Sequence, residues 1–274
     1  MAGILKVATC QFDVTGDIKK NLTAIKRQIK KAAENNADVV HFSECCLSGY
    51  GGFDFEKFLP ETENQIQKGI SEICGLAKIH KIWVIFGSHF FEGKSEKPFN
   101  SLFVINEKGK IKIRYDKRLL AEFDLDWYKP GTDLGIFNIK GIKCGLLICH
   151  EWRYPELYRQ FYHLGVELLF QSWYDGNHSE EEYLDEGKNL GEVIPGFVRG
   201  NAANNKLWIS GANTSKKQSS FPGFVVQPDG RILGKLKRNV SGVLISEIDF
   251  NEEYIDLSSH LRDKVIGMDL TLLK

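Results

Sequence analysis

Short apolar runs alternate with amphipathic segments through the first half of the chain. Runs long enough for buried strands cover residues 5–12, 38–42, 82–88 and 145–148. Between them, apolar residues recur at helical spacing, first at Ile18, Leu22, Ile25 and Ile29, then at Ile66, Ile70, Ile73 and Ala77. This alternation predicts strands joined by helices.

The middle and the end of the chain add hairpins to this pattern. Residues 101–106 and 110–114 flank a Lys108-Gly109 turn, and a second hairpin is predicted around Pro228-Asp229-Gly230. Further strands are expected over 166–170 and 207–211, with helices after Pro155 and over 196–205. We therefore expect a layered α/β protein with mixed sheets. Because no linker-like stretch or repeat interrupts it, we expect a single domain over 1–274.

Composition and charge exclude several partners. The chain has 36 basic and 36 acidic residues, which gives no reason to expect nucleic acid or an anionic membrane as partner. No apolar run approaches the ~20 residues of a membrane span, and the N-terminus lacks a signal-peptide layout. The six cysteines are scattered without a paired motif, so we expect free thiols in the cytoplasm.

Cys149 is the strongest candidate for a reactive residue. It follows the apolar strand that ends at Ile148, six residues before Pro155 opens a predicted helix. A cysteine at such a turn is exposed at a sheet edge, near backbone N–H groups that favour a thiolate or an oxyanion. The alternative, a small buried side chain, is common for a cysteine considered alone.

Two more ionisable residues end predicted strands, namely Glu44 and Lys117. Ends of neighbouring strands meet at one edge of a sheet, where sites on α/β scaffolds usually lie. A thiol with an ordinary pKa near ~8.5 needs a base, and a poorly solvated carboxylate is such a base. A lysine ammonium beside both would stabilise the thiolate and then the oxyanion of a tetrahedral intermediate. These three residues therefore predict thiol-dependent acyl transfer.

Three segments together resemble the signatures of the nitrilase superfamily, the carbon–nitrogen hydrolases with a Glu-Lys-Cys triad. They are Phe42-Ser43-Glu44, Tyr115-Asp116-Lys117 and the stretch from Gly145 through Cys149-His150-Glu151-Trp152-Arg153 to Glu156. The resemblance implies an αββα sandwich that pairs through its helices into a four-layer homodimer or larger assembly. It also implies that Cys149 is acylated without any cofactor, that Glu44 is the general base, and that Lys117 and the backbone N–H of His150 hold the oxyanion.

Other positions of the resemblance are less direct. Many family members carry a second glutamate before a Pro-Gly, and that place falls here on Asp124, with Glu122 as a rival. Glu151 stands where the family often has aspartate. Asn201-Ala202-Ala203-Asn204-Asn205 replaces a usual Arg-Ala-x-Glu-Asn, a change at the substrate pocket or the dimer interface.

Substrate contacts are predicted at Tyr50, Phe53, Glu151, Trp173 and Tyr174, although the last two also suit a core. The acidic segment 175–191 is expected to be a solvated helix or a mobile flap, and its charge favours a cationic substrate. The apolar residues of the tail, 251–274, are expected to pack on a partner subunit. The histidines near Cys149 match no zinc spacing, so no metal site is predicted.

The expected activity is hydrolysis of a small linear amide, an ω-amide or an N-carbamoyl amine, with a nitrilase reaction as the alternative. Two rivals remain open at this point. One is a hydrolase in which His150, His163 or His89 serves as the base for the cysteine. The other is a catalytically silent family member that acts as a binding or assembly protein.

Overall fold

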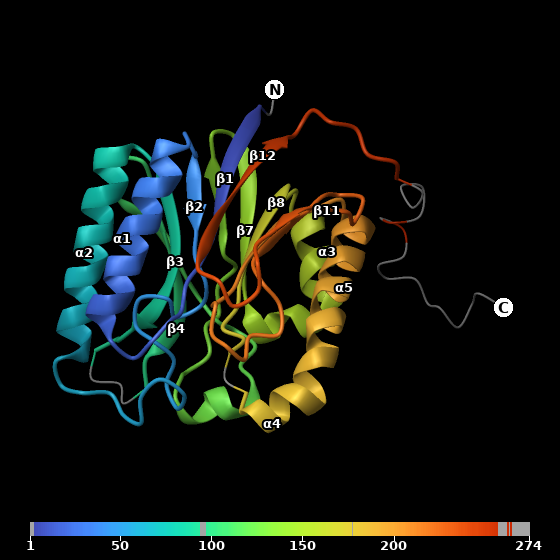
Figure 1. The fold of residues 1–274 in the computed structure, drawn as a ribbon. Coiled ribbons are helices and arrows are strands. Elements are labelled where there is room, and N and C mark those ends of the chain that lie inside the picture. Colours follow the sequence, from blue (N-terminus) through green and yellow to red (C-terminus); the bar gives the residue numbers. More distant parts are fainter. Residues whose placement is uncertain (1–2, 94–96, 177, 257–261, 263, 265–274) are drawn as a thin grey trace.

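Two mixed sheets lie face to face, and helices cover the outer side of each (Figure 1). The structure is a computed structural model that describes residues 3–93, 97–176, 178–256, 262 and 264. Six strands form the first sheet in the order β12-β1-β2-β3-β4-β5, and six form the second in the order β11-β10-β9-β8-β7-β6. The predicted αββα sandwich is confirmed.

The first sheet comes mainly from the first 116 residues. Its strands are β1 (Ile4–Gln11), β2 (Val39–His41), β3 (Trp83–Phe90), β4 (Phe99–Ile105), β5 (Ile111–Asp116) and β12 (Gly242–Asp249). The outer face carries α1 (Ile18–Glu34) and α2 (Thr62–His80), whose apolar stripes pack on it as predicted. Asp17 caps α1 by accepting from the N–H groups of Lys19 and Lys20. Because β2 is parallel to β3 and the β3–β4 and β4–β5 pairs are antiparallel, the carboxyl ends of β2 and β5 lie at the same edge of this sheet.

The second sheet follows in sequence. Its strands are β6 (Ile136–Ile139), β7 (Ile142–Ile148), β8 (Leu168–Ser172), β9 (Trp208–Ala212), β10 (Phe224–Val226) and β11 (Ile232–Lys235). Helices α3 (Pro155–His163) and α5 (Lys188–Asn205) pack on its outer face. The parallel neighbours β7, β8 and β9 run side by side, so their carboxyl ends open on one edge.

The inner faces of the sheets meet through an apolar layer with a buried polar line across it. His41 lies between Ser210, 2.9 Å from Nδ1, and Ser172, 2.9 Å from Nε2. Thr9 Oγ1 lies 2.8 Å from Ser210 Oγ. Burial lowers the pKa of His41 to about 3, so the ring is neutral and joins the sheets through hydrogen bonds. These contacts fix how the two sheets sit on each other.

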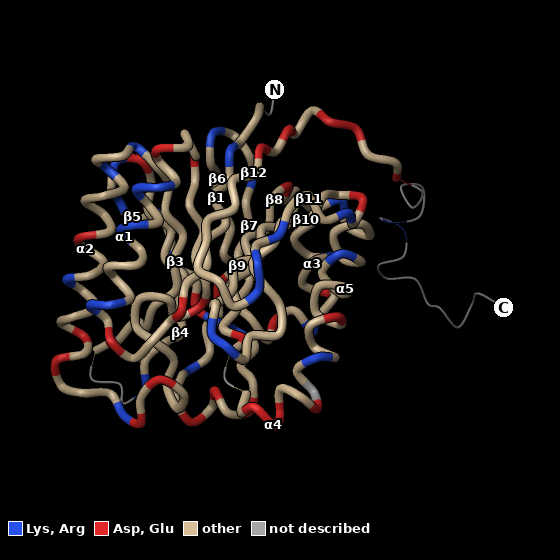
Figure 2. The backbone as a smooth tube through the Cα atoms, viewed as in Figure 1, with Lys and Arg blue, Asp and Glu red and all other residues tan. Residues whose placement is uncertain are grey.

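Charges of both signs are spread over the helices and loops (Figure 2). The basic face of α1 is solvated, and some of its lysines have acidic partners, as in the ion pair between Lys26 and Glu72. No helix among the described ranges is both long and apolar enough to cross a bilayer.

The predicted elements were incomplete in two places. The helix expected over 196–205 begins at Lys188, and it follows a helical turn α4 (Glu180–Glu182) and a π-helical turn η3 (Tyr183–Gly187). Pro195 lies inside α5 because the apolar positions around it pack on the second sheet and outweigh the lost N–H bond. Strands β6 and β12 were not predicted. Of the tail, residues 257–261, 263 and 265–274 lie outside the described residues, so its packing on a partner stays a prediction.

Candidate active site

Three chain segments bring the predicted Glu, Lys and Cys residues together. Glu44 follows β2, Lys117 directly follows β5, and Cys149 follows β7. Lys117 Nζ lies 3.0 Å from Glu44 Oε1. Cys149 and Lys117 line the same cavity, and both charged partners act on the thiol. The convergence that the sequence suggested is therefore present in the structure.

Glu44 is fully buried and held by three donors. Asn100 Nδ2 donates to Oε1 at 2.7 Å, the Tyr174 N–H donates to Oε2 at 2.9 Å, and Lys117 makes the ion pair. Burial raises the pKa of Glu44 above its usual value, and the charge of Lys117 opposes that rise. A carboxylate with a raised proton affinity suits a general base for a thiol.

The loop after β2 approaches β3 so closely that only glycine fits opposite it. A Cβ at Gly87 would lie 2.3 Å from the backbone nitrogen of Cys45 and 2.7 Å from the oxygen of Ser43. Cys45 itself has a positive φ of 50°, an uncommon conformation for a residue with a side chain. This tight turn sets the direction in which Glu44 leaves β2.

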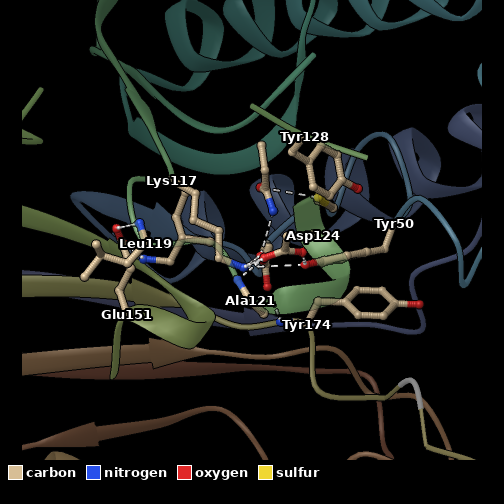
Figure 3. A network of polar contacts seen from close by, with 12 residues as sticks. Tyr50, Lys117, Leu119, Ala121, Asp124, Tyr128, Glu151 and Tyr174 are labelled. Carbon is tan, nitrogen blue, oxygen red and sulfur yellow. Dashed lines mark hydrogen bonds and ion pairs between the residues drawn. The ribbon is translucent and has the colours of Figure 1, made fainter. Parts of the chain in front are cut away.

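Lys117 lies between two carboxylates (Figure 3). Its Nζ is 2.8 Å from Asp124 Oδ2 as well as 3.0 Å from Glu44, and the Tyr50 hydroxyl lies 3.5 Å away. Burial by itself would lower the pKa of this ammonium. The charges of Glu44 and Asp124 more than offset that effect and raise the pKa well above its usual value. Lys117 therefore stays charged inside the protein.

Asp124, rather than Glu122, meets the lysine. It lies on the 3-10 helix η1 (Glu122–Asp126), is fully buried, and accepts from the Ala121 N–H at 2.9 Å and from the Tyr50 hydroxyl. Glu122, on the same turn, is exposed. The tight turn brings Asp124 close to Lys117, so that the shorter aspartate side chain still reaches the ammonium.

Cys149 sits at a strained bend between β7 and the 3-10 helix η2 (Cys149–Arg153). Its φ of 39° is unusual for a residue with a side chain, and such strain often accompanies function. The sequence predicted a direct turn into a helix, whereas η2 comes first and α3 begins only at Pro155. The first turn of η2, which includes His150, has N–H groups without intrahelical partners. The expected oxyanion position is thus next to the thiol.

The Cys149 thiol is protonated at rest. Burial raises its pKa well above the usual value and the charge of Glu44 adds to this, while Lys117 acts in the opposite direction. A neutral thiol is a weak nucleophile. Activation therefore requires that a neighbouring base take its proton.

Glu151, predicted as a substrate contact, does not line the described cavity. It is fully buried and absent from the cavity wall. The Tyr115 hydroxyl donates to it at 2.6 and 2.7 Å, and the N–H groups of Ile148 and Arg118 donate at 2.7 and 3.0 Å. This carboxylate ties the η2 turn to β5. The position next to a nucleophile gave no sign of this role.

The cavity above Cys149 is small, about 160 Å³. Of the predicted substrate contacts, Tyr50, Phe53, Trp173 and Tyr174 line it, and so does His150, which was predicted as a backbone oxyanion donor. Ala121 and Phe123 from the turn that holds Asp124, and Asp175 and His178 from the acidic segment, also line it, as the sequence suggested for these two regions. Trp152, Arg153, Leu190 and Ile194 line it as well and were not predicted. Asp175 Oδ1 lies 3.2 Å from His178 Nε2, and the Arg153 guanidinium lies over the Trp152 ring.

The histidines of the rival mechanism lie in different places. His150 is at the cavity, His89 is buried beside Cys45 and Tyr128, and His163 is exposed at the end of α3. Within the described part of the chain, no three His, Cys, Asp or Glu side chains are arranged to hold a metal ion.

The αββα sandwich and the site together define the class of the protein, a thiol hydrolase. Comparison with known proteins identifies the family. The model of the carbon–nitrogen hydrolase family matches residues 6–254. The chain belongs to this family and is a carbon–nitrogen hydrolase.

Several curated relatives are amidases. The chain is 26% identical over 272 residues to the 2-oxoglutaramate amidase of Bacillus subtilis (strain 168), covering 96% of both chains. It is 25% identical over 263 residues to the N-carbamoylputrescine amidase of Arabidopsis thaliana, covering 89% of this chain and 86% of that one. Both relatives hydrolyse C–N bonds according to their names.

The fold is shared with a solved amidase from Nesterenkonia sp. The TM-score is 0.76 at 20% identity, with 91% of this chain and 92% of that chain covered. Other structures of that amidase hold butyramide or carry an acetamide moiety on the active-site cysteine.

Proposed function

We propose that the protein hydrolyses a small linear amide, an ω-amide or an N-carbamoyl amine through a Cys149 acyl-enzyme. One observation carries this proposal: a buried ammonium is held between two carboxylates beside a strained, partly exposed cysteine. Glu44, Lys117 and Cys149 are the catalytic residues. Asp124 is the second acid, which holds Lys117.

In the first half-reaction Glu44 takes the thiol proton as Sγ attacks the carbonyl carbon. The oxygen becomes an oxyanion that accepts from Lys117 Nζ and the His150 N–H. Two of the three ammonium protons already face carboxylates. The third makes only a long contact, 3.5 Å, to the Tyr50 hydroxyl and can turn to the oxyanion. Protonated Glu44 then gives its proton to the departing nitrogen, and ammonia or an amine leaves.

In the second half-reaction water attacks the thioester. Glu44 takes a proton from that water, the oxyanion forms again at the same donors, and collapse expels the thiol with return of the proton from Glu44. The acid product leaves and the resting state is restored. Every step uses side chains and water, so we propose no cofactor and no metal.

The size and lining of the cavity support a small substrate. A volume of about 160 Å³ corresponds to roughly five water molecules at ~30 Å³ each, which suits a short amide. Tyr50, Phe53 and Phe123 have ring centroids 5.1 to 6.1 Å apart at the mouth, and the two phenylalanines are exposed. An apolar part of the substrate can lie on these rings.

A cationic substrate, as the acidic segment suggested, gains less support. Asp175 already accepts from the Ser220 N–H at 2.6 Å and contacts His178. Arg153 adds a positive charge to the same wall. Measuring ammonia release from amides, ω-amides, carbamoyl amines and nitriles tests the proposal. Turnover of nitriles alone would establish the nitrilase alternative, and no turnover with slow Cys149 labelling would establish the silent one.

We also propose a homodimer in the cytoplasm. A groove of about 860 Å³ between α3 and α5 is walled by Leu157, Leu164 and Asn201, on the outer helical face where the resemblance places the partner. The six cysteines are free, which suits a reducing compartment. Sedimentation at micromolar protein tests the dimer, and a monomer would refute it.

A further inference from the structure

A second polar cluster lies against Glu44 and also reaches Lys117. It contains Cys45, His89 and Asn100, which are 0, 1 and 1% exposed. His89 and Asn100 are direct partners across β3 and β4. Cys45 follows Glu44 in the chain, so the turn after β2 brings its thiol to this pair.

The contacts form a chain that ends on the catalytic carboxylate. His89 Nε2 lies 3.6 Å from Cys45 Sγ, and Cys45 Sγ donates to Asn100 Oδ1 at 3.4 Å. Asn100 Nδ2 donates to Glu44 Oε1 at 2.7 Å. The Asn100 backbone oxygen also accepts from the Lys117 N–H at 2.8 Å. Asn100 therefore contacts both members of the buried ion pair.

The direction of the Asn100 amide matters for Glu44. The two ends of an amide have nearly the same shape but opposite hydrogen-bonding character. With the NH₂ group toward Glu44 the carboxylate gains a donor, and with the oxygen there it would face a second acceptor. Local partners decide between these orientations. Here the only donor placed on Oδ1 by the described contacts is the Cys45 thiol.

We propose that Cys45 and Asn100 are positioning residues for the general base: the thiol fixes the direction of the amide, and the amide holds Glu44 as an oriented, ionised acceptor. This inference rests on the proposed role of Glu44. Neither residue touches the reacting atoms, and both act through the carboxylate.

The charge states of the cluster agree with this role. Burial raises the pKa of the Cys45 thiol well above its usual value, and the charge of Glu44 adds to the rise, so the sulfur keeps its proton for donation. Burial lowers the pKa of His89 to about 3, so the ring is neutral. Among the described groups around Glu44, the charges come from Lys117 and Asp124, and Tyr50, Tyr128 and Cys149 are neutral.

Removing the Asn100 amide takes one donor from the ionised form of Glu44. A hydrogen bond to a charged group favours that form, so its loss raises the pKa of Glu44. The pH at which Glu44 becomes able to take the thiol proton then moves upward. We expect a shift of about one pH unit, or about tenfold slower reaction on the acid side.

The experiment measures the rate of Cys149 alkylation by iodoacetamide against pH, with peptide mass spectrometry to assign the site. This readout needs no known substrate. The variants are Asn100→Ala, Cys45→Ala and Cys45→Ser, with Cys46→Ala as the matched control. Cys46 is equally buried but donates to the Gly87 oxygen at 3.5 Å, away from Asn100. Its loss therefore reproduces the removal of a buried thiol without touching the amide.

We expect the acid limb of the curve of alkylation rate against pH to move to higher pH in Asn100→Ala and, by a smaller amount, in Cys45→Ala. Cys45→Ser keeps a donor and should retain the wild-type limb, as should Cys46→Ala. Identical limbs in all four variants, or an equal shift in Cys46→Ala, would overturn the inference. If Cys45→Ala does not fold, Asn100→Ala against Cys46→Ala decides.

One further variant separates this inference from the proposed function. If Glu44→Gln leaves the alkylation profile unchanged, Glu44 is not the base and the proposed function fails with the inference. If Glu44→Gln abolishes the acid limb but Asn100→Ala does not move it, only the positioning role is refuted.

Discussion

Glu44 and Glu151 are two buried carboxylates at strand ends of the same site, yet their surroundings give them different roles. Burial is the main cause of a raised pKa in both. Glu44 is paired with an ammonium and acts on the Cys149 thiol. Glu151 is surrounded by the Tyr115 hydroxyl and backbone N–H groups, away from the cavity. Burial therefore does not identify a catalytic acid, whereas the partners and the access to the reacting atom do.

The largest expected effect is a loss of kcat when Glu44 is substituted, which the substitution of Glu151 should not reproduce. Glu44→Gln removes the proposed base, and kcat for ammonia release should fall at least about 10³-fold, within the usual range for general bases. Lys117→Ala should give a similar loss because the oxyanion loses its cation. A steady-state ammonia assay on folded protein measures both. Turnover of Glu44→Gln within tenfold of the wild type would break the comparison.

The second effect concerns stability at Glu151. Glu151→Gln turns one of the two accepting oxygens into an NH₂ group, so either the Ile148 N–H on Oε2 or the Arg118 N–H on Oε1 loses its acceptor and faces a second donor. We expect the free energy of unfolding to fall by about 2–3 kcal/mol, measured by urea denaturation. Its kcat should exceed that of Glu44→Gln by at least tenfold. A variant as stable as the wild type but inactive would show that Glu151 is catalytic instead.

The third prediction extends the role of burial to His41. Its pKa is about 3 in the folded protein against ~6.5 when unfolded, so the unfolded state binds more protons between these values. This contribution to stability is present above pH ~6.5 and is lost as the pH falls toward 3. The buried carboxyls Glu44 and Glu151, with raised pKa values, act in the opposite direction.

Comparing the wild type with His41→Gln cancels the carboxyl contributions. The wild type should lose about 1.4 kcal/mol more per pH unit between about pH 6 and 4. Urea midpoints at a series of pH values measure this slope. Parallel slopes in the two proteins would mean that His41 is charged in the folded state.

The smallest effect concerns the mouth of the cavity. Phe123→Ser removes one exposed ring next to Asp124 and leaves the acid in place. If the substrate tail lies on this ring, kcat/KM for hexanamide should fall about fourfold, because each buried methylene contributes ~0.8 kcal/mol. Acetamide, too short to reach the ring, should be hydrolysed unchanged and is the control. An equal loss for both amides would place the substrate elsewhere.

The strongly patterned parts of the fold could be predicted from the sequence. The stripe that includes Ile18, Ile25 and Ile29 gave α1, and the Lys108-Gly109 turn gave the β4–β5 hairpin. Strand β12 was missed because its apolar run, from Val243 to Ile245, is only three residues long before the polar Ser246 and Glu247. The start of α5 was missed because its polar first turns and Pro195 look like a boundary.

The residues of the site likewise differ in how well the sequence predicts them. Glu44, Lys117 and Cys149 are recognisable because each ends a strand within a motif of the family. Asn100 carries no such mark, since only the pairing of β4 with β3 and the turn at Cys45 bring it to Glu44. The resemblance placed the second acid at Asp124 with Glu122 as a rival, and the η1 turn shows that Asp124 is the one that meets Lys117. Residues that act through three-dimensional neighbours leave little trace in the local sequence.

The central claim is that a carbonyl compound acylates Cys149 with the help of Glu44. The most direct measurement is mass spectrometry of protein mixed with butyramide or another hydrolysed amide and quenched in acid within milliseconds to seconds. The account predicts an acyl adduct on the peptide that contains Cys149, present in the wild type and Glu151→Gln but absent from Glu44→Gln. Turnover with no adduct on that peptide at any time, or an undiminished adduct in Glu44→Gln, would contradict it.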